Sequence, residues 1–183
     1  MKKLGVIVPY RNRHLHLTEF KKQIVSYLDS NSYENYVIII VEQDDARLFN
    51  RGMLLNIGFK EAEKQDCDYV VFHDVDMLPI YVNYSYYSKP LHLATNFILD
   101  DEEKERTIFD EYFGGVTMFP VDTFKKIDGY SNKYWGWGYE DDDLRFRCEE
   151  KNIPLKTKKI KNYKPIGKSL KLNGINAYVK VKN

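Results

Sequence analysis

The stretch Tyr69-Val70-Val71-Phe72-His73-Asp74-Val75-Asp76 passes from a short apolar run directly into two carboxylates. Apolar runs of this length, rich in β-branched residues, are typical of buried strands. Residues 4–8 and 36–41 have the same character, whereas residues 15–28 and 50–64 space their apolar side chains like helices. Strands and helices alternate, so the first half predicts an α/β fold with a largely parallel sheet.

Polar motifs follow each of the three predicted strands, at residues 9–13, 42–45 and 74–76. In parallel sheets, ligands bind outside the carboxyl ends of the strands. We therefore expect these three motifs to converge on one edge of the sheet and to form a binding site there.

The second half has a less regular pattern. It predicts strands at residues 92–97 and 113–119, and helices at residues 121–127 and 140–151. The acidic stretch at residues 100–106 is expected to be mobile. At 183 residues, the chain has the length of one domain with a substantial core.

Composition excludes several classes of protein. The net charge is +1, so no bulk attraction to nucleic acid is expected. Cys67 and Cys148 support neither a disulfide framework nor a zinc site. The apolar run at the N-terminus is too short for a secretion signal, and no segment has the length of a membrane span. A reducing cytosol is the expected setting.

Residues 151–183 contain many lysines and no acidic residue. Such a run is either a solvated surface or a site of contact with phosphates. The phosphates would belong to a nucleotide, to an anionic acceptor or to a membrane surface.

The stretch Tyr134-Trp135-Gly136-Trp137-Gly138-Tyr139-Glu140-Asp141-Asp142-Asp143 combines two indoles, two glycines and four carboxylates. Adjacent like charges repel, and core packing alone does not explain them. Aromatic faces suit a sugar ring, and a carboxylate suits proton removal, so we expect a site that activates a hydroxyl group. Asp141 and Glu140 are the candidates for that step. At least one of Asp142 and Asp143 is expected to serve the helix that follows.

Asp74 and Asp76 lie two residues apart at a strand end, where both side chains can project to one side. Oxygen ligands of this kind suit Mg²⁺ or Mn²⁺ with a diphosphate, and the alternative is a solvated turn. Arg11, Arg13 and Arg51 could bind phosphate through their guanidinium groups, or form surface salt bridges.

Aromatic and histidine residues near these motifs have weaker signals. Phe49 or Tyr10 could stack on a nucleobase, although a phenylalanine beside a helix start is more often part of the core. We expect His73 and His92 to be packed structural histidines rather than metal ligands.

At these residues the chain resembles the β-1,4-galactosyltransferases, which are inverting enzymes. The resemblance rests on five blocks in the family's order, which reach to about Arg147: residues 8–13, 49–59, 72–76, 112–116 and 129–143. It implies a GT-A fold in one domain, residues 1–183, whose basic C-terminal segment, residues 151–183, is shorter than in the family. It also implies transfer of galactose from UDP-galactose to a hydroxyl of a glycan or glycolipid.

The resemblance also implies roles for single residues. The donor site it implies consists of Pro9, Arg11, Arg13, Phe49, Arg51, Asp74, Val75, Asp76, Gly115 and Trp137. Asp76 would be the direct ligand of Mn²⁺ or Mg²⁺, with Asp74 supporting it. Asp141, with Glu140 beside it, would act as the base. Tyr112 matches the tyrosine that favours galactose over N-acetylgalactosamine.

The chain departs from the family at the metal site. Family members supply a histidine ligand some two dozen residues past the acidic run, but residues 161–170 contain none, and no histidine follows His92. We expect weak metal binding by Asp76 and the diphosphate alone, or positive charge supplied by Lys164 or Lys168. The alternative function is a catalytically silent protein of the same fold that binds a nucleotide sugar or a glycan.

Animal Golgi members of the family carry a membrane anchor and a stem, which this sequence does not show. We therefore expect a cytosolic enzyme. The basic segment would allow peripheral contact with the inner face of an anionic membrane.

Overall fold

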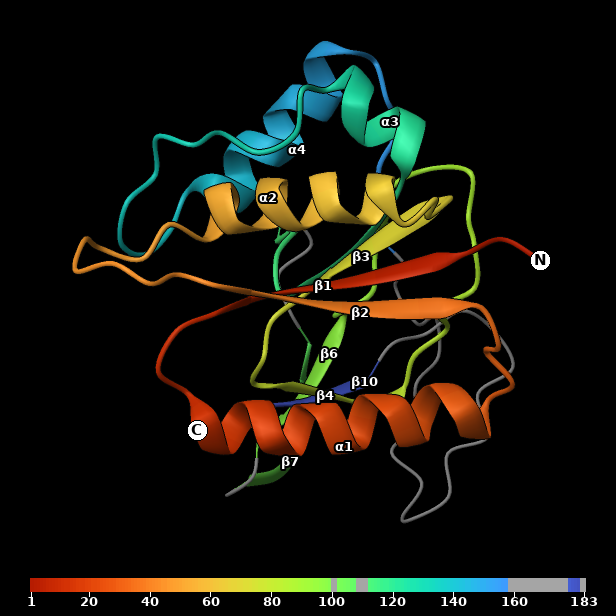
Figure 1. Ribbon diagram of the computed structural model, residues 1–183. Helices are drawn as coiled ribbons and strands as arrows, with labels where there is room; N and C mark the ends of the chain where they lie inside the picture. The colour runs from red at the N-terminus through yellow and green to blue at the C-terminus, as the bar shows by residue number, and fades with distance from the viewer. Residues whose placement is uncertain (100–101, 108–111, 158–177, 182–183) are drawn as a thin grey trace.

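A six-stranded mixed sheet runs through the centre of the computed structural model, which describes residues 1–99, 102–107, 112–157 and 178–181 (Figure 1). Its strands, in spatial order, are β2 (Tyr36–Glu42), β1 (Leu4–Tyr10), β3 (Tyr69–His73), β8 (Val116–Pro120), β5 (Leu91–His92) and β9 (Lys156–Thr157). β1 is parallel to both β2 and β3, whereas β8 is antiparallel to β3 and β5. The predicted parallel sheet is confirmed for the first half, and the second half adds an antiparallel extension.

Helices cover both faces of this sheet (Figure 1). They are α1 (His14–Ser30) on one face, and α2 (Arg51–Lys64), α3 (Val121–Lys126) and α4 (Glu140–Glu150) on the other. Alternation along β1 accounts for the two layers, since successive side chains point to opposite faces. Val6 and Val8 share a core cluster with Phe20 of α1, whereas Ile7 packs in a second cluster with Leu55 of α2.

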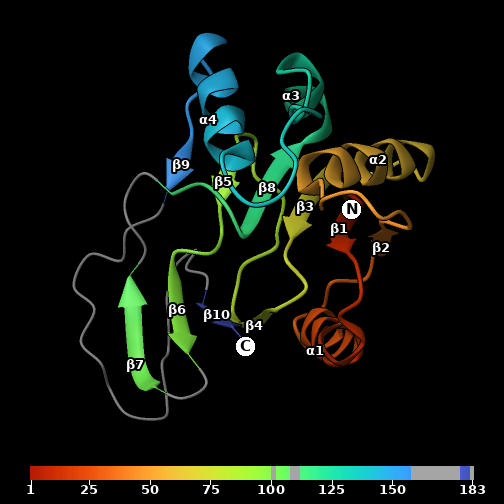
Figure 2. The same cartoon turned by 90° about the vertical axis from the view of Figure 1, so that its left-hand side faces the viewer.

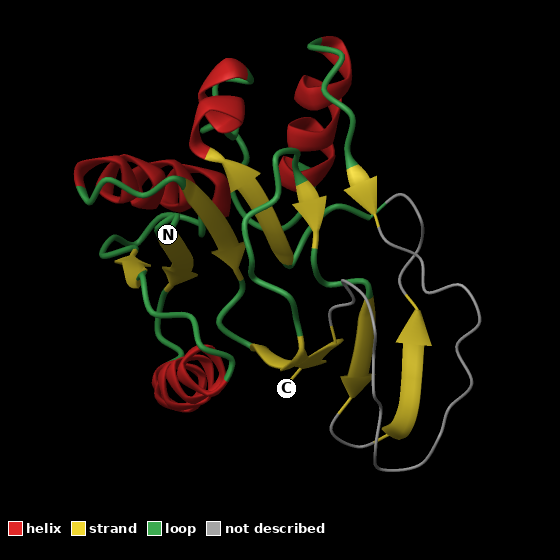
Figure 3. Ribbon diagram, turned by 90° about the vertical axis from the view of Figure 1, so that its right-hand side faces the viewer, coloured by secondary structure: helices red, strands yellow, loops and turns green. Residues whose placement is uncertain are grey.

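A second, four-stranded sheet lies beside the first (Figures 2 and 3). Its strands, in spatial order, are β4 (Met77–Tyr81), β10 (Tyr178–Val181), β6 (Asn96–Leu99) and β7 (Glu102–Thr107). β4 follows β3 after a short turn, so the turn that carries Asp74 and Asp76 stands where the chain passes from one sheet to the other.

Most of the predicted helices and strands of the first half are confirmed, but the second sheet was not foreseen. The strand predicted at residues 92–97 is wrong, because the chain turns between β5 and β6. The amides of Leu93 and Ala94 both donate to the carbonyl of Val116, and the amide of Thr95 donates back to Leu93. Of the stretch at residues 100–106 that was expected to be mobile, residues 100–101 lie outside the described residues and the rest belongs to β7, which pairs with β6.

The predictions about cellular location and membrane contact depend on segments that the structure describes only in part. Within the described ranges, none of the helices combines the length and the apolar composition that a membrane crossing requires. Of the basic segment, residues 158–177 and 182–183 lie outside the described residues, and Lys164 and Lys168 are among them.

Close contact between α2 and the sheet places the first turn of α2 at the end of the strands. Gly58 makes this contact possible, because a Cβ there would clash with Ile7 Cγ2 and lie 2.9 Å from Val41 Cγ2. Arg51, at the start of the same helix, is thereby held at the carboxyl edge of β1 and β3.

Replacing Gly58 by alanine should therefore destabilise the protein. We expect a net loss of about 1–2 kcal/mol in the free energy of unfolding, because overpacking of this severity costs up to about 3 kcal/mol and alanine recovers only roughly 1 kcal/mol over glycine in a helix. Urea denaturation measures it. The half-exposed neighbour Ile57 provides the control, since Ile57→Ala should change stability by only about 0.5 kcal/mol. An equal or higher stability for Gly58→Ala would contradict the tight contact.

Candidate functional site

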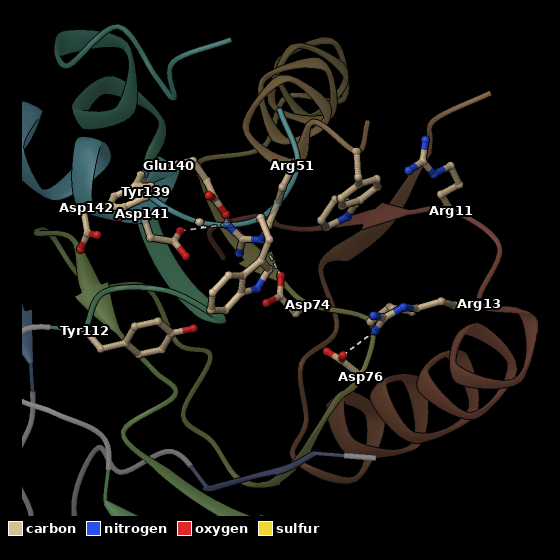
Figure 4. Close-up of a pocket in the computed structure, with 16 residues that line it drawn as sticks. Arg11, Arg13, Arg51, Asp74, Asp76, Tyr112, Tyr139, Glu140, Asp141 and Asp142 are labelled. Atoms are coloured by element: carbon tan, nitrogen blue, oxygen red, sulfur yellow. Dashed lines mark hydrogen bonds and ion pairs between the residues drawn. The ribbon is translucent and has the colours of Figure 1, made fainter. Parts of the chain in front are cut away.

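A pocket of about 620 Å³ opens at the carboxyl ends of β1 and β3 (Figure 4). The residues that line it are Pro9, Arg11, Arg13, Phe49, Arg51, Asp74, Val75, Asp76, Tyr112, Gly136, Trp137, Gly138, Tyr139, Glu140, Asp141 and Asp142. Of the residues to which the family resemblance assigns a role in the donor site, in proton removal or in sugar selectivity, all except Gly115 are among them. Five parts of the chain, around residues 9–13, 49–51, 74–76, 112 and 136–142, therefore meet in one cavity.

Arg51 lies at the centre of the pocket, where it joins the turn after β3 to the start of α4 (Figure 4). Its Nε donates to Asp74 Oδ1 at 2.7 Å, and its Nη1 donates to Asp141 Oδ1 at 2.8 Å and to Glu140 Oε1 at 3.5 Å. Its side chain is only 11% exposed. The salt bridges of this arginine are therefore buried rather than on the surface, whereas its contact with a donor phosphate stays a prediction. Arg51 is the buried cation of a carboxylate cluster.

The charges in this cluster shift one another's ionisation. Burial opposes the charge of Arg51, but Asp141 and Asp74 outweigh it and raise the arginine pKa well above its ordinary value. Burial also raises the pKa of Asp74, although Arg51 opposes this shift. Burial raises the pKa of Asp141 to about 7. Arg51 opposes this shift, whereas the charges of Asp74 and Glu140 add to it. A carboxylate with such a pKa is suited to accept a proton near neutrality.

The four acidic residues of the run form the first turn of α4. Acids in a first turn are favoured by the helix dipole, and residues 140–143 occupy that turn. Asp143 accepts from Arg147 Nε, four residues along the helix, and does not line the pocket. The expectation that at least one of the last two acids serves the helix is therefore confirmed. Asp142 is exposed and lines the pocket.

The segment before α4 has an unusual backbone. Tyr139 adopts a φ of 72°, in the left-handed region that bulky residues rarely occupy. Gly136 and Gly138 also have positive φ values. This turn directs Glu140 and Asp141 inward. Trp137, expected to lie beneath a sugar ring, is 99% exposed at the pocket rim.

The opposite side of the pocket is cationic and aromatic. The Arg11 guanidinium lies over the Phe49 ring, 5.4 Å from its centroid. Arg13 Nη1 donates to Asp76 Oδ2 at 2.6 Å (Figure 4). Tyr10, considered for stacking on a nucleobase, is instead buried with its hydroxyl bonded to His14 Nδ1. Of the two aromatic candidates, only Phe49 lines this pocket.

The motif at residues 42–45 lies at the predicted edge of the sheet, where the Gln43 amide donates to the Tyr10 carbonyl at 2.9 Å, but it does not line the pocket. Gln43 is buried and braces the loop before α2 instead. Its Oε1 accepts from the Asn50 amide at 2.8 Å, and its Nε2 donates to the Leu48 carbonyl at 2.9 Å. Asn50 in turn caps α2 by accepting from the Met53 amide. A polar side chain that is buried in a loop leaves no mark in the apolar pattern.

Asparagines, which the sequence analysis did not single out, attach the second half to α2. Asn50 Nδ2 donates to the Asn132 carbonyl, and Asn56 Nδ2 donates to the Tyr130 carbonyl, both at 2.8 Å. The Tyr130 amide donates back to Asn56 Oδ1. These bonds hold the segment that leads into α4 against the helix that carries Arg51.

The glycine pair before β8 has two different roles. Gly115, predicted to bind the donor, does not line the pocket. Its carbonyl accepts from the Asp74 amide at 3.0 Å and so supports the turn behind the pocket wall. Gly114 went unnoticed, yet a Cβ there would clash with Asp141 Oδ2 and lie 2.7 Å from the Tyr112 hydroxyl. The Gly-Gly pair was the available signal for this close approach.

The two buried histidines are structural, as expected. His73 bonds to the Asp74 carbonyl and the Tyr84 hydroxyl, and His92 Nε2 bonds to the Gly114 carbonyl. Burial lowers the pKa of both imidazoles to about 4.

The donor groups present suit a metal ion only together with further ligands. Within the described ranges, no three His, Cys, Asp or Glu side chains come together as a metal cage. Asp74 is engaged by Arg51, whereas Asp76 faces the pocket and pairs with the more exposed Arg13. Mg²⁺-type sites often use one or two carboxylates plus substrate phosphates. Asp76, supported by Asp74, fits an ion of that kind.

Comparisons with known proteins agree with these features. The family described as "N-terminal region of glycosyl transferase group 7" matches residues 1–89, and "N-terminal domain of galactosyltransferase" matches residues 100–169. Xylosylprotein 4-beta-galactosyltransferase of Caenorhabditis elegans is 36% identical over 153 residues, which are 84% of this chain and 52% of that protein. Human beta-1,4-galactosyltransferase 6 is 42% identical over 146 residues, which are 78% of this chain and 37% of that protein. The chain thus spans about half the length, or less, of these curated relatives.

Solved structures extend the likeness to the fold. The catalytic domain of Drosophila beta1,4galactosyltransferase 7 in complex with xylobiose has a TM-score of 0.76 and 31% identity, covering 85% of this chain and 64% of that one. A mutant of the same Drosophila protein, in complex with manganese, UDP-Gal and xylobiose, has a TM-score of 0.73 and 30% identity over the same shares.

Removing the central cation should test how much the site depends on it. We expect Arg51→Met to cost about 3–5 kcal/mol in the free energy of unfolding, because it leaves buried carboxylates unpaired. Their pKa values would rise further, so the folded state would bind more protons than the unfolded chain. The loss should therefore shrink as the pH falls. Urea denaturation above and below neutral pH measures both effects.

Arg13→Met is the matched control. This arginine also pairs with a pocket carboxylate, but its side chain is 52% exposed, so its loss should cost at most about 1 kcal/mol. Equal losses for the two variants would refute the central role of Arg51.

Proposed function

Because the chain belongs to the β-1,4-galactosyltransferase family and has the GT-A fold, we propose that it is an inverting glycosyltransferase. It moves galactose from UDP-galactose onto a hydroxyl group of a glycan. The observation that carries this proposal is the single pocket in which buried Asp141, with a pKa raised to about 7, lies opposite the Asp74–Asp76 turn.

The donor nucleotide would occupy the cationic side of the pocket. Phe49 and Arg11 offer a ring and a guanidinium to the uridine portion. Arg13 uses one Nη nitrogen for Asp76, and a guanidinium has further N–H groups for a phosphate oxygen.

Asp76, supported by Asp74, would hold Mn²⁺ or Mg²⁺ together with the diphosphate. When bound, the ion supplies positive charge that offsets the charge developing on the departing UDP. The Drosophila relative solved with manganese and UDP-Gal supports this assignment. Since the histidine ligand of the family is missing, we propose that the ion binds this chain weakly without the nucleotide.

Asp141 would act as the base. Arg51 holds its Oδ1, whereas Oδ2 lies beside Gly114, near the Tyr112 hydroxyl. An acceptor hydroxyl gives its proton to this free oxygen, and the acceptor oxygen forms a bond to the anomeric carbon. The bond from that carbon to UDP breaks, and its electron pair leaves with the diphosphate. Attack opposite the leaving group inverts the anomeric configuration. Glu140, which also contacts Arg51, keeps the cluster in place.

The identity of the sugars rests on relatives. We propose that Tyr112 restricts the donor to galactose, by analogy with the family tyrosine at this position. The Caenorhabditis relative is named a xylosylprotein galactosyltransferase, and the Drosophila relative was solved with xylobiose. Xylosides therefore come first in an acceptor panel, followed by other glycans and glycolipids. Cytosolic location and membrane contact through residues 151–183 stay predictions.

Purified protein supplied with UDP-galactose, Mn²⁺ and this panel should release UDP and form a galactosylated product. If no acceptor gave either transfer or UDP release, the proposed enzyme activity would be refuted. Calorimetric binding of UDP without turnover would instead support the catalytically silent alternative, which the small set of metal ligands favours.

Asp141→Asn should remove transfer while UDP binding persists. The amide cannot take the proton but still accepts from Arg51, so we expect a loss in kcat of about a hundredfold or more. Product formation and calorimetric titration with UDP and Mn²⁺ measure the two effects. Asp143→Asn is the matched control on the same helix, because Asp143 does not line the pocket. A fully active Asp141→Asn protein would exclude this base.

The rate should depend on pH through Asp141. The carboxylate must be ionised to accept a proton, and burial raises its pKa to about 7. We therefore expect kcat/KM to fall about tenfold per pH unit below pH 7 and to level off above it. UDP affinity measured over the same range separates this effect from donor binding. A flat profile well below neutral pH would be inconsistent with Asp141 as the titrating base.

A further inference from the structure

The turn that carries Asp76 is supported from beneath by a buried histidine. The Met77 amide donates to the Asp74 carbonyl at 3.2 Å and closes the turn, with Val75 and Asp76 between them. His73 Nδ1 bonds to the same carbonyl at 3.0 Å. This carbonyl oxygen only accepts, so Nδ1 carries the hydrogen and donates it. The carbonyl that closes the turn thus has two donors.

The second ring nitrogen of His73 reaches Tyr84. His73 Nε2 and the Tyr84 hydroxyl are 2.8 Å apart, and both residues are fully buried. The two rings stack with centroids 6.0 Å apart, and Phe20 of α1 packs edge-on against the imidazole. With Nδ1 protonated in a neutral ring, Nε2 accepts and the Tyr84 hydroxyl donates. The Tyr84 hydroxyl therefore stabilises the tautomer that the Asp74 carbonyl requires.

Tyr84 is itself held against α1. Its amide donates to the Tyr33 hydroxyl at 2.9 Å. The Tyr27 hydroxyl, on α1, accepts from the Val82 amide and donates to the Val82 carbonyl. Contacts therefore run without a break from α1, through the segment after β4, to His73 and the turn.

Support from the pocket side is weaker. Asp76 pairs there with Arg13, whose side chain is 52% exposed, and exposed ion pairs contribute little. The placement of Asp76 therefore depends on its neighbours in the turn, where Arg51 and the Gly115 carbonyl hold Asp74 and the buried hydrogen bonds of His73 lie behind the turn.

We propose that His73 and Tyr84 are positioning residues, which hold Asp76 in place for a divalent metal and the diphosphate of the donor. This inference rests on the proposed function of the pocket. Neither residue lines the pocket, so their effect on the donor passes through the Asp74 carbonyl.

Calorimetric titration of UDP in the presence of Mn²⁺ tests the proposal. His73→Gln places an amide nitrogen at the level of Nε2 and leaves the Asp74 carbonyl without its side-chain donor. Tyr84→Phe removes the hydroxyl that stabilises this tautomer and holds the imidazole in place. We expect each change to weaken Mn²⁺-dependent UDP binding by about tenfold or more, as is typical for groups that orient a metal ligand. With UDP-galactose, the donor KM should rise while kcat at saturation stays close to that of the natural protein.

Two variants separate positioning from general stability. His73→Asn carries its amide nitrogen the same number of bonds from Cα as Nδ1, so it should restore most of the affinity lost in His73→Gln. Tyr36→Phe removes a hydroxyl from a tyrosine that packs on the same core cluster and bonds to Asp29. It should leave Mn²⁺-dependent UDP binding unchanged. Thermal melts identify any variant that fails to fold, and Tyr84→Phe is the gentler change.

Each outcome is decisive. Suppose that the natural protein binds UDP in the presence of Mn²⁺ and that His73→Gln and Tyr84→Phe bind it equally well. This result would overturn the positioning role and leave the proposed function intact. If His73→Asn and His73→Gln lost the same amount of Mn²⁺-dependent UDP affinity, the positioning role would also be overturned, since the bond made by Nδ1 would then not matter. Natural protein that shows no Mn²⁺-dependent UDP binding would overturn the proposed function, and this inference with it.

Discussion

The buried guanidinium of Arg51 connects the parts of this protein that do chemistry. It bonds to Asp74 at the end of β3 and to Glu140 and Asp141 at the start of α4. A buried cation without partners is very costly, and so are buried carboxylates without a cation. The turn after β3 and the N-terminus of α4 therefore stabilise each other, because each supplies carboxylates to the same buried cation.

The rest of the fold serves to bring Arg51 to this position. Gly58 lets α2 lie close to β1, and Asn50 caps the helix just before Arg51. Gln43 braces the loop in front of that cap, and Asn56 ties the segment before α4 onto the same helix. Each contact is a polar bond or a close approach, and together they fix one guanidinium within reach of three carboxylates.

The pocket has two sides with different physical character. On one side, Arg11 and Arg13 are exposed or half-exposed cations, suited to a ligand that brings negative charge. On the other, Asp141 is buried, and its proton affinity is raised by loss of water. A reaction that combines a departing anion with removal of a proton needs both environments. The strained turn at Tyr139 leads directly into Glu140 and Asp141, and Trp137 lies at the rim.

Local apolar pattern was sufficient for the strands and helices of the first half, because each buries one face or both against its neighbours. It failed where pairing is nonlocal. β4 contains Pro79 and reads poorly as a strand, yet proline is tolerated in a strand at the edge of a sheet, which is where β4 lies. The run at residues 92–97 reads as one strand, but Val116 accepts from two successive amides and turns the chain between the sheets.

The sequence by itself determined the alternating fold, the family resemblance and all the residues that the resemblance assigned to the site except Gly115, because motif identity and order are properties of the chain. The tertiary structure decided what those residues do for one another. It placed Arg51 on carboxylates, moved Gly115 behind the pocket wall, and put Gly114 where Tyr112 and Asp141 meet. Charge, burial and close approach between distant segments depend on distances in space, which spacing along the chain does not contain.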